Sequence, residues 1–334
     1  MKIAMMGPRA VGKTTILTAV FNETKSSIAT TMLKLTDRGD TGRELQDRLY
    51  QLKSVFKKQE DITDNSHPGA GAEATHNEHN FYFSFGIQGK DPSIDMEIKD
   101  FPGEYVTTMP ERVMTFISEA TAVFIAIDTP HLMEQDGKFN EIKNKTALIT
   151  QFFRTALEGI DSEKLVMLIP LKCEKYFREQ RMEEVLQRVE NTYADLIKQF
   201  RQSLKICCTV APILTLGDVE FDTFKYDATG NVELDVDGTP NMVRYKYVGD
   251  KPKYSPRFCS QPLYATLSFL AAQYTRQARR ESFWKKMLRN IWNVFKSDEQ
   301  LFEEVLKMEK NRISEQPKLG YKVLCGGELF HYDH

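Results

Sequence analysis

The chain has 334 residues, 41% of them hydrophobic, and its 45 basic residues nearly balance 47 acidic ones to give a net charge of −2. That balance provides no positive field for nucleic acid, so we expect no direct nucleic-acid partner. The five cysteines include no CxxC pair, and no run approaches the roughly 20 apolar residues of a membrane helix. These features argue against a disulfide framework, a zinc site and a membrane span, and they predict a cytoplasmic protein.

The first third of the chain alternates between predicted strands and helices. A short apolar run precedes Gly7 and helical spacing follows it, and a second amphipathic helix comes next. A polar, glycine-rich loop then leads to two segments in which apolar and polar residues alternate, as in a β-hairpin. In order, the segments are the strand 2–6, the helix 12–22, the helix at about 41–59, the loop 64–79 and the strands 80–87 and 93–101.

The middle of the chain continues this alternation. Residues 121–128 and 164–172 are continuous apolar runs, which are typical of parallel strands covered on both faces. Helical segments are predicted at about 139–158 and 181–203, and a last core strand lies within 205–216. Together with the N-terminal elements, they predict an α/β fold with a doubly wound, mostly parallel sheet.

The pattern changes after Leu216. Residues at about 218–256 form short alternating segments with turn signals at 229–231 and 237–238, so we expect a small β insertion there. The apolar helix expected at 261–280 would close the sheet domain. We therefore predict one domain over 1–280, followed by an amphipathic helical extension and a polar tail over 281–334.

The extension carries an apolar stripe at helical spacing, with basic residues beside it. Three interpretations remain open: packing on the chain's own sheet domain, docking of a partner protein, or contact with a membrane surface. The apolar stripe consists of Phe283, Trp284, Met287, Leu288, Ile291, Trp292 and Phe295.

The segment from Gly7 to Thr14 fits the pattern G-x-x-x-x-G-K-[ST] and lies between a predicted strand and a predicted helix. Glycines allow the backbone N–H groups of such a loop to point at phosphate oxygens, and the helix start favours the same anion. Lys13 is expected to reach the β- and γ-phosphates and the Thr14 hydroxyl to ligate Mg²⁺. The expected nucleotide contacts here are Gly7, Arg9, Ala10, Val11, Gly12, Lys13, Thr14 and Thr15.

A second motif, Asp100-x-x-Gly103, follows the predicted hairpin and precedes a core strand. In switch-type nucleotide hydrolases, an aspartate at this place supports Mg²⁺ through water, and the glycine N–H contacts the γ-phosphate. Asp100 is therefore a candidate metal residue, and Gly103 a candidate phosphate contact.

The order of GPRAVGKT, DFPGE, AVFIAID, LIPLKCEKY and TVAPILTLG resembles the Ras-like P-loop GTPases of the translation-factor-related class over roughly residues 1–280. The residues of the first motif are most similar to those of divergent bacterial double-GTPase domains, which are associated with conflict or defence gene clusters. The resemblance implies a GTP-dependent molecular switch that uses Mg²⁺, cycles between GTP and GDP, and signals to a partner protein.

The family reads guanine with N-K-x-D, where this chain has Leu171-Lys172-Cys173-Glu174. The resemblance implies that Lys172 covers the base and that Glu174 accepts its two N–H donors. The first-switch threonine that binds Mg²⁺ and the γ-phosphate would be Thr75. Glu104 stands where the family places a water-orienting glutamine, and Arg9 can act as an arginine finger in cis.

Two other functions remain open. A P-loop kinase or ATPase would use ATP, and a kinase lid could come from residues 176–188 with Arg178 and Arg181. A scaffold would keep the nucleotide without hydrolysing it. For the switch, we expect the partner protein to contact the switch loops or the C-terminal helix.

Overall fold

The computed structural model describes residues 1–58, 62–63, 78–279, 299–308 and 321–330. Its main feature is an eight-stranded sheet in the order β11-β8-β7-β6-β1-β5-β4-β2. The neighbours from β8 to β5 are all parallel, as the apolar runs predicted. These parallel strands are β1 (Lys2–Met6), β5 (Ile94–Asp100), β6 (Ala122–Asp128), β7 (Lys164–Leu171) and β8 (Ile206–Val210).

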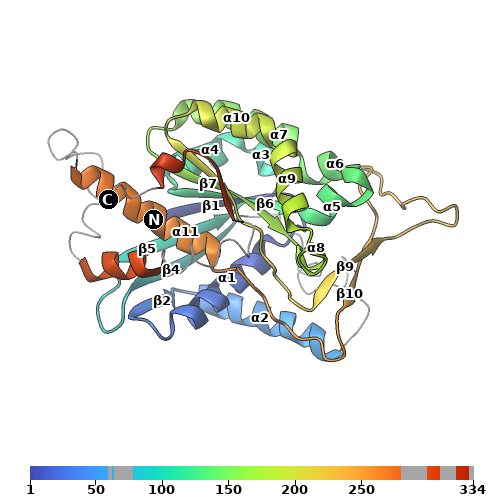
Figure 1. The fold of residues 1–334 in the computed structure, drawn as a ribbon, viewed down its shortest axis with the longest axis horizontal. Coiled ribbons are helices and arrows are strands. Elements are labelled where there is room, and N and C mark those ends of the chain that lie inside the picture. The colour runs from blue at the N-terminus through green and yellow to red at the C-terminus, as the bar shows by residue number, and fades with distance from the viewer. Residues whose placement is uncertain (59–61, 64–77, 280–298, 309–320, 331–334) are drawn as a thin grey trace.

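Helices cover both faces of the sheet, with α1 and α11 on one face and α4, α7 and α10 on the other (Figure 1). Successive strand residues point to opposite faces, so Ile3 and Met5 lie in one buried cluster while Ala4 and Met6 lie in the other. The helices are α1 (Lys13–Ile28), α2 (Thr41–Lys58), α3 (Tyr105–Thr108), α4 (Pro110–Glu119), α5 (Thr129–Met133), α6 (Asn140–Asn144), α7 (Thr146–Ala156), α8 (Glu174–Arg178), α9 (Met182–Thr192), α10 (Ala194–Gln202) and α11 (Gln261–Arg279).

Antiparallel strands flank the parallel core on both sides. The predicted hairpin is confirmed as β4 (His79–Ile87) paired with β5. Strand β2 (Leu33–Asp37) pairs with β4 and has no counterpart in the sequence prediction. On the opposite edge, β11 (Lys322–Cys325) pairs with β8. These residues lie within the predicted extension and tail, and main-chain hydrogen bonds to β8 hold them in a strand that the sequence analysis did not predict.

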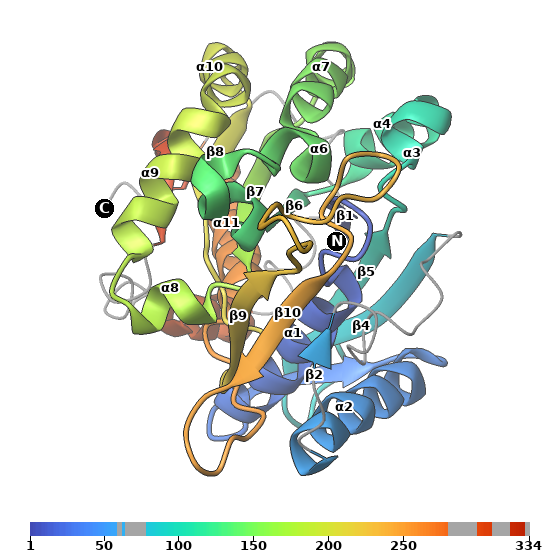
Figure 2. The ribbon, with the colours of Figure 1, turned by 90° about the vertical axis from the view of Figure 1, so that its right-hand side faces the viewer.

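A second, three-stranded sheet contains the predicted insertion. Strands β9 (Val219–Phe224) and β10 (Val243–Tyr247) pair antiparallel, and β3 (Ile62–Thr63) adds to β10. Apolar residues of this sheet pack with Leu52 and Phe56 of α2. The sheet lies in front of α1 when the molecule is viewed from the side that carries α5, α6 and α8 (Figure 2). It therefore borders the edge at which the parallel strands end.

The end of the described chain packs on the sheet domain. Residues 299–308 are helical, and Leu301, Val305 and Met308 are buried in the same apolar cluster as α1 and α11. This contact favours packing as the role of that part of the extension. The apolar stripe from Phe283 to Phe295 lies outside the described residues. None of the helices within the described ranges is both long and apolar enough to cross a membrane.

Candidate functional site

The loop between β1 and α1 contains three residues with positive φ angles. Gly7 and Gly12 have φ angles of 145° and 104°, and Ala10 adopts the left-handed region at 58°. A Cβ on Gly7 would lie 2.8 Å from the carbonyl oxygen of Ala126 on β6, so the close approach of the two strands requires glycine. Alternating backbone conformations of this kind turn successive N–H groups toward one side.

Lys13 begins α1 and is nearly buried, with its ammonium 3.2 Å from the carbonyl oxygens of both Gly7 and Pro8. The first hydrogen bond of the helix runs from Ile16 N–H to the Gly12 carbonyl over 2.9 Å. The N–H groups of Lys13, Thr14 and Thr15 therefore precede the helix's own acceptors and face outward from its positive end.

The second motif meets this loop directly. Asp100 ends β5 next to β1, and its carboxylate lies 3.9 Å from the Lys13 ammonium. A Cβ on Gly103 would lie 2.8 Å from the Gly7 carbonyl oxygen and 3.2 Å from the Arg9 nitrogen. The two predicted motifs thus form one surface, here called the phosphate corner (residues 7–15 with Asp100 and Gly103).

Asp100 is unusual within the phosphate corner because of its burial and its hydrogen bonding. Its carboxyl is fully buried, and neither oxygen has a hydrogen-bond partner among the described residues. Burial raises the pKa of Asp100, although the charges of Lys13, His79 and Arg48 and the hydroxyl of Thr14 act to lower it. A buried anionic oxygen without a partner is costly, and Mg²⁺ prefers oxygen ligands. The residues present therefore fit a magnesium ion held by Thr14 and Asp100.

The other residues expected at this corner have different exposures. Arg9 and Ala10 are exposed at the tip of the loop, whereas Val11 is buried beneath it. Glu104 is half-buried where α3 begins, and its backbone carbonyl accepts hydrogen bonds from the hydroxyls of Thr107 and Thr108. Thr75 lies outside the described residues, so its first-switch role stays a prediction.

At the ends of β6 and β7 the chain forms a second polar cluster, here called the base corner (Asp128, His131, Lys172 and Glu174). Lys172 adopts a left-handed backbone with φ of 61°, and its ammonium lies 2.8 Å from Asp128 Oδ2. The same ammonium lies 5.5 Å from the ring centre of Tyr245 on β10. The charge of Lys172 is therefore compensated by Asp128, and its side chain lies close to β10.

Asp128 is fully buried and has further partners. Its Oδ1 lies 2.6 Å from His131 Nδ1 and accepts the His131 backbone N–H, while Asn144 bonds both the N–H and the carbonyl of Asp128. The charges of Lys172 and His131 hold the pKa of Asp128 well below its usual range despite its burial. The sequence analysis missed Asp128 and His131, for which the only signal was polar residues at the end of a buried strand.

Glu174 has a different partner from the one that the resemblance implies. It begins α8 with its carboxylate buried, and Oε1 accepts the Leu216 N–H at 2.8 Å. Burial raises the pKa of Glu174 to about 7, and the N–H groups of the loop 215–217 offset part of that rise. In this structure, the hydrogen bond from Leu216 to Glu174 therefore connects the loop 215–217 to α8.

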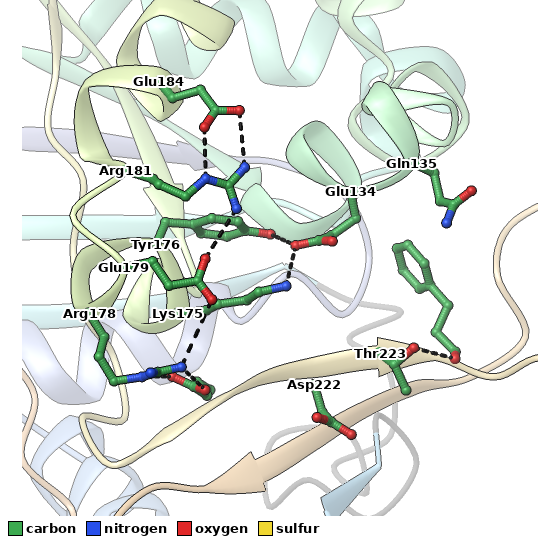
Figure 3. Close-up of polar contacts among 12 residues, drawn as sticks. Glu134, Gln135, Lys175, Tyr176, Arg178, Glu179, Arg181, Glu184, Asp222 and Thr223 are labelled. Carbon is green, nitrogen blue, oxygen red and sulfur yellow. Dashed lines mark hydrogen bonds and ion pairs between the residues drawn. The ribbon is translucent and has the colours of Figure 1, made fainter.

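The two arginines of the possible kinase lid are paired with carboxylates (Figure 3). Arg178 donates to Glu220 of β9 from Nε at 2.7 Å, and Arg181 donates to Glu184 at 2.8 Å. Lys175 and Tyr176 both bond Glu134, at 2.7 and 2.8 Å. This network joins α8 to the insertion and to the segment after α5, and its arginines do not lie open toward a phosphate.

The described parts of the chain contain no cluster of three or more His, Cys, Asp or Glu side chains suited to a metal ion. A magnesium site at the phosphate corner would therefore depend on one carboxylate, a hydroxyl and the ligand's own oxygens. Comparison with known proteins gives no match: no protein-family model fits this chain, and no curated protein matches it.

Proposed function

We propose that this chain is a P-loop nucleotide hydrolase of Ras-like fold that binds GTP with Mg²⁺ and acts as a molecular switch. The observation that carries the proposal is the phosphate corner. There, a buried carboxylate with no hydrogen-bond partner in the described part of the chain lies 3.9 Å from a buried lysine, beside the N–H groups of a helix start. A magnesium-chelated polyphosphate would place a cation beside the oxygens of Asp100 and would offer phosphate oxygens to Lys13 and to the N–H groups of the helix start.

The roles of the residues follow from their placement. Lys13 and the N–H groups from Arg9 to Thr15 hold the phosphates, and Thr14 and Asp100 hold Mg²⁺, which neutralises charge on the phosphate oxygens when bound. Gly103 rests against the loop, so its N–H is close to where the terminal phosphate would lie. Loss of that phosphate would release the segment after β5, and a partner protein would sense this change.

The base corner supports guanine through Lys172, whose stem can cover the ring while Asp128 holds its ammonium. Glu174 would have to exchange its bond to the Leu216 N–H for bonds to the base. The kinase alternative receives less support, because Arg178 and Arg181 are paired with carboxylates.

Calorimetric titration with GTP, GDP, ATP and ADP, each with Mg²⁺ and again with EDTA, tests the proposal. We expect tight binding of the guanine nucleotides that weakens without Mg²⁺. In Lys13→Ala the affinity should fall by about tenfold or more, since a charge-assisted contact to phosphate is lost. Lys25→Ala is the matched control, because Lys25 lies on the same helix but pairs with Asp37 at 2.8 Å.

The outcomes separate the functions. Slow phosphate release from GTP alone supports the switch, release only with an acceptor molecule supports a kinase, and binding without release supports a scaffold. If the wild-type protein binds no purine triphosphate, or if Lys13→Ala and Lys25→Ala behave alike, the proposed function is wrong.

A further inference from the structure

Helix α2 is an addition to the alternating core, and it packs against β4, the neighbour of the strand that carries Asp100. Its first residue, Thr41, accepts the Tyr82 N–H of β4 on its hydroxyl at 2.9 Å. Further along, Glu44 lies 3.6 Å from Nδ1 of His79, and His79 is the residue directly opposite Asp100 in the β4–β5 ladder. Directly opposite residues in an antiparallel pair have Cα atoms about 4.5–5.5 Å apart. The polar face of α2 is therefore one side chain away from Asp100.

Arg48 projects from this face of α2. One of its terminal nitrogens, Nη2, donates to Glu44 Oε1 at 3.2 Å, which leaves the guanidinium only partly bonded. Its Nε is buried and has no hydrogen-bond partner among the described residues. The positive charge of Arg48 also acts on the carboxyl of Asp100, where it lowers the pKa together with Lys13 and His79. The charges of Lys13 and Arg48 thus both act on one buried carboxylate.

A buried guanidinium N–H without an acceptor costs free energy, which a ligand with anionic oxygens can recover. Glu44 accepts from Nη2 of Arg48 and makes no hydrogen bond to Nε. A phosphate oxygen beside Asp100 fits, because arginine's fixed fork of donors matches the geometry of phosphate.

We propose that Arg48 contacts the terminal phosphate of the bound triphosphate and stabilises the charge that develops there during hydrolysis. The inference rests on the proposed function and adds to it a residue from the extra helix. In the reaction, a water oxygen bonds to the γ-phosphorus while the bond from that phosphorus to the bridging oxygen breaks. The diphosphate leaves with the electron pair, and the water's proton passes to the released phosphate or to solvent.

Arg9 is the other arginine near this site, but it is exposed on the loop. The alternative for Arg48 is a purely structural pair with Glu44, four residues before it on the same helix. A structural pair would affect folding alone. A phosphate contact would affect triphosphate but not diphosphate, and this difference is the basis of the test.

The test compares wild type, Arg48→Ala, Arg48→Lys and Arg43→Ala. Arg43 is the matched control, since it lies on the same helix with 77% of its side chain exposed and pairs with Asp40. Binding of GDP and of a non-hydrolysable GTP analogue is measured, followed by single-turnover hydrolysis of GTP. Circular dichroism with thermal unfolding shows that each variant is folded.

For Arg48→Ala we expect GDP affinity within about twofold of wild type and a hydrolysis rate lower by about 100-fold or more, as for other arginines that contact a transferring phosphoryl group. The GTP analogue should bind more weakly. Lysine should restore little, because it lacks the planar fork. Equal hydrolysis by wild type and a folded Arg48→Ala would overturn this role alone, whereas a wild-type protein that binds no triphosphate overturns the proposed function itself.

Discussion

The phosphate corner and the base corner lie at the same edge of one sheet, yet their buried polar groups are satisfied differently. At the phosphate corner, both oxygens of Asp100 and the Nε of Arg48 have no hydrogen-bond partner among the described residues. At the base corner, Asp128 bonds Lys172 and His131, and Glu174 bonds the loop after β8. The first arrangement gains from a charged ligand, whereas the second stabilises the fold without one, so a base there must exchange existing bonds.

The largest expected effect on the free energy of unfolding comes from removing the carboxylate of Asp128 at the base corner. Asp128→Ala should lower the free energy of unfolding by about 3–5 kcal/mol, because it removes a fully buried carboxylate that bonds both Lys172 and His131. Urea unfolding at pH 7 measures this loss. The control is Asp136→Ala, which removes a 97% exposed carboxylate paired with Arg188 and should change stability by less than about 1 kcal/mol. Equal effects at the two positions would contradict the view that the base corner is held together by its own charges.

A smaller effect concerns the pH dependence of Glu174. Burial raises its pKa from 4.5 to about 7, so the native state keeps a proton that the unfolded state releases. Stability should therefore fall as the pH rises from 4.5 to 7, by about 1.4 kcal/mol for each pKa unit. Glu174→Gln should remove this part of the slope and be more stable than wild type at pH 8. Unfolding curves from pH 4.5 to 8 measure it, with Glu111→Gln, an exposed position on α4, as the control.

The smallest stability effect is expected at the phosphate corner. Asp100→Asn removes a buried charge, and because burial raises the pKa of Asp100, the ligand-free protein should not lose stability at pH 7. Its affinity for Mg²⁺–GTP should nevertheless fall. Chemical unfolding without nucleotide, followed by calorimetry with it, tests both. A loss of stability as large as that of Asp128→Ala would remove the distinction between the two corners.

The sequence could indicate that residues 7–15 lie beside Asp100 and Gly103, because this placement follows from local spacing and from neighbouring strands. The spacing of Gly7, Gly12 and Lys13 lies within one loop, and Asp100 meets Lys13 because β5 pairs with β1. Asp128 escaped prediction because two of its partners are distant in sequence: Lys172, which follows β7 with a left-handed backbone, and Asn144 of α6. The hydrogen-bond partner of Glu174 was not predictable either, because it depends on where the loop after β8 lies in the fold.

The contrast between local signals and contacts with distant parts of the chain also explains which strands were predicted. Long apolar runs predicted the parallel strands, and clear alternation predicted β4 and β5. Strands β2, β3 and β11 are short and gain their conformation from partners elsewhere in the chain, so their own residues carry a weak signal. Arg48 was unremarkable in the sequence, since only the placement of α2 brings it near Asp100.

The pairing of β11 with β8 has a consequence for how the protein is made. Strand β8 is synthesised long before residues 322–325, and until they leave the ribosome one side of β8 exposes a row of unpaired N–H and C=O groups. Such a row is a template for pairing with another chain. A nascent or truncated protein that lacks β11 would therefore be prone to aggregation at this side of the sheet, which makes a chaperone that shields exposed strands a natural aid to its biogenesis.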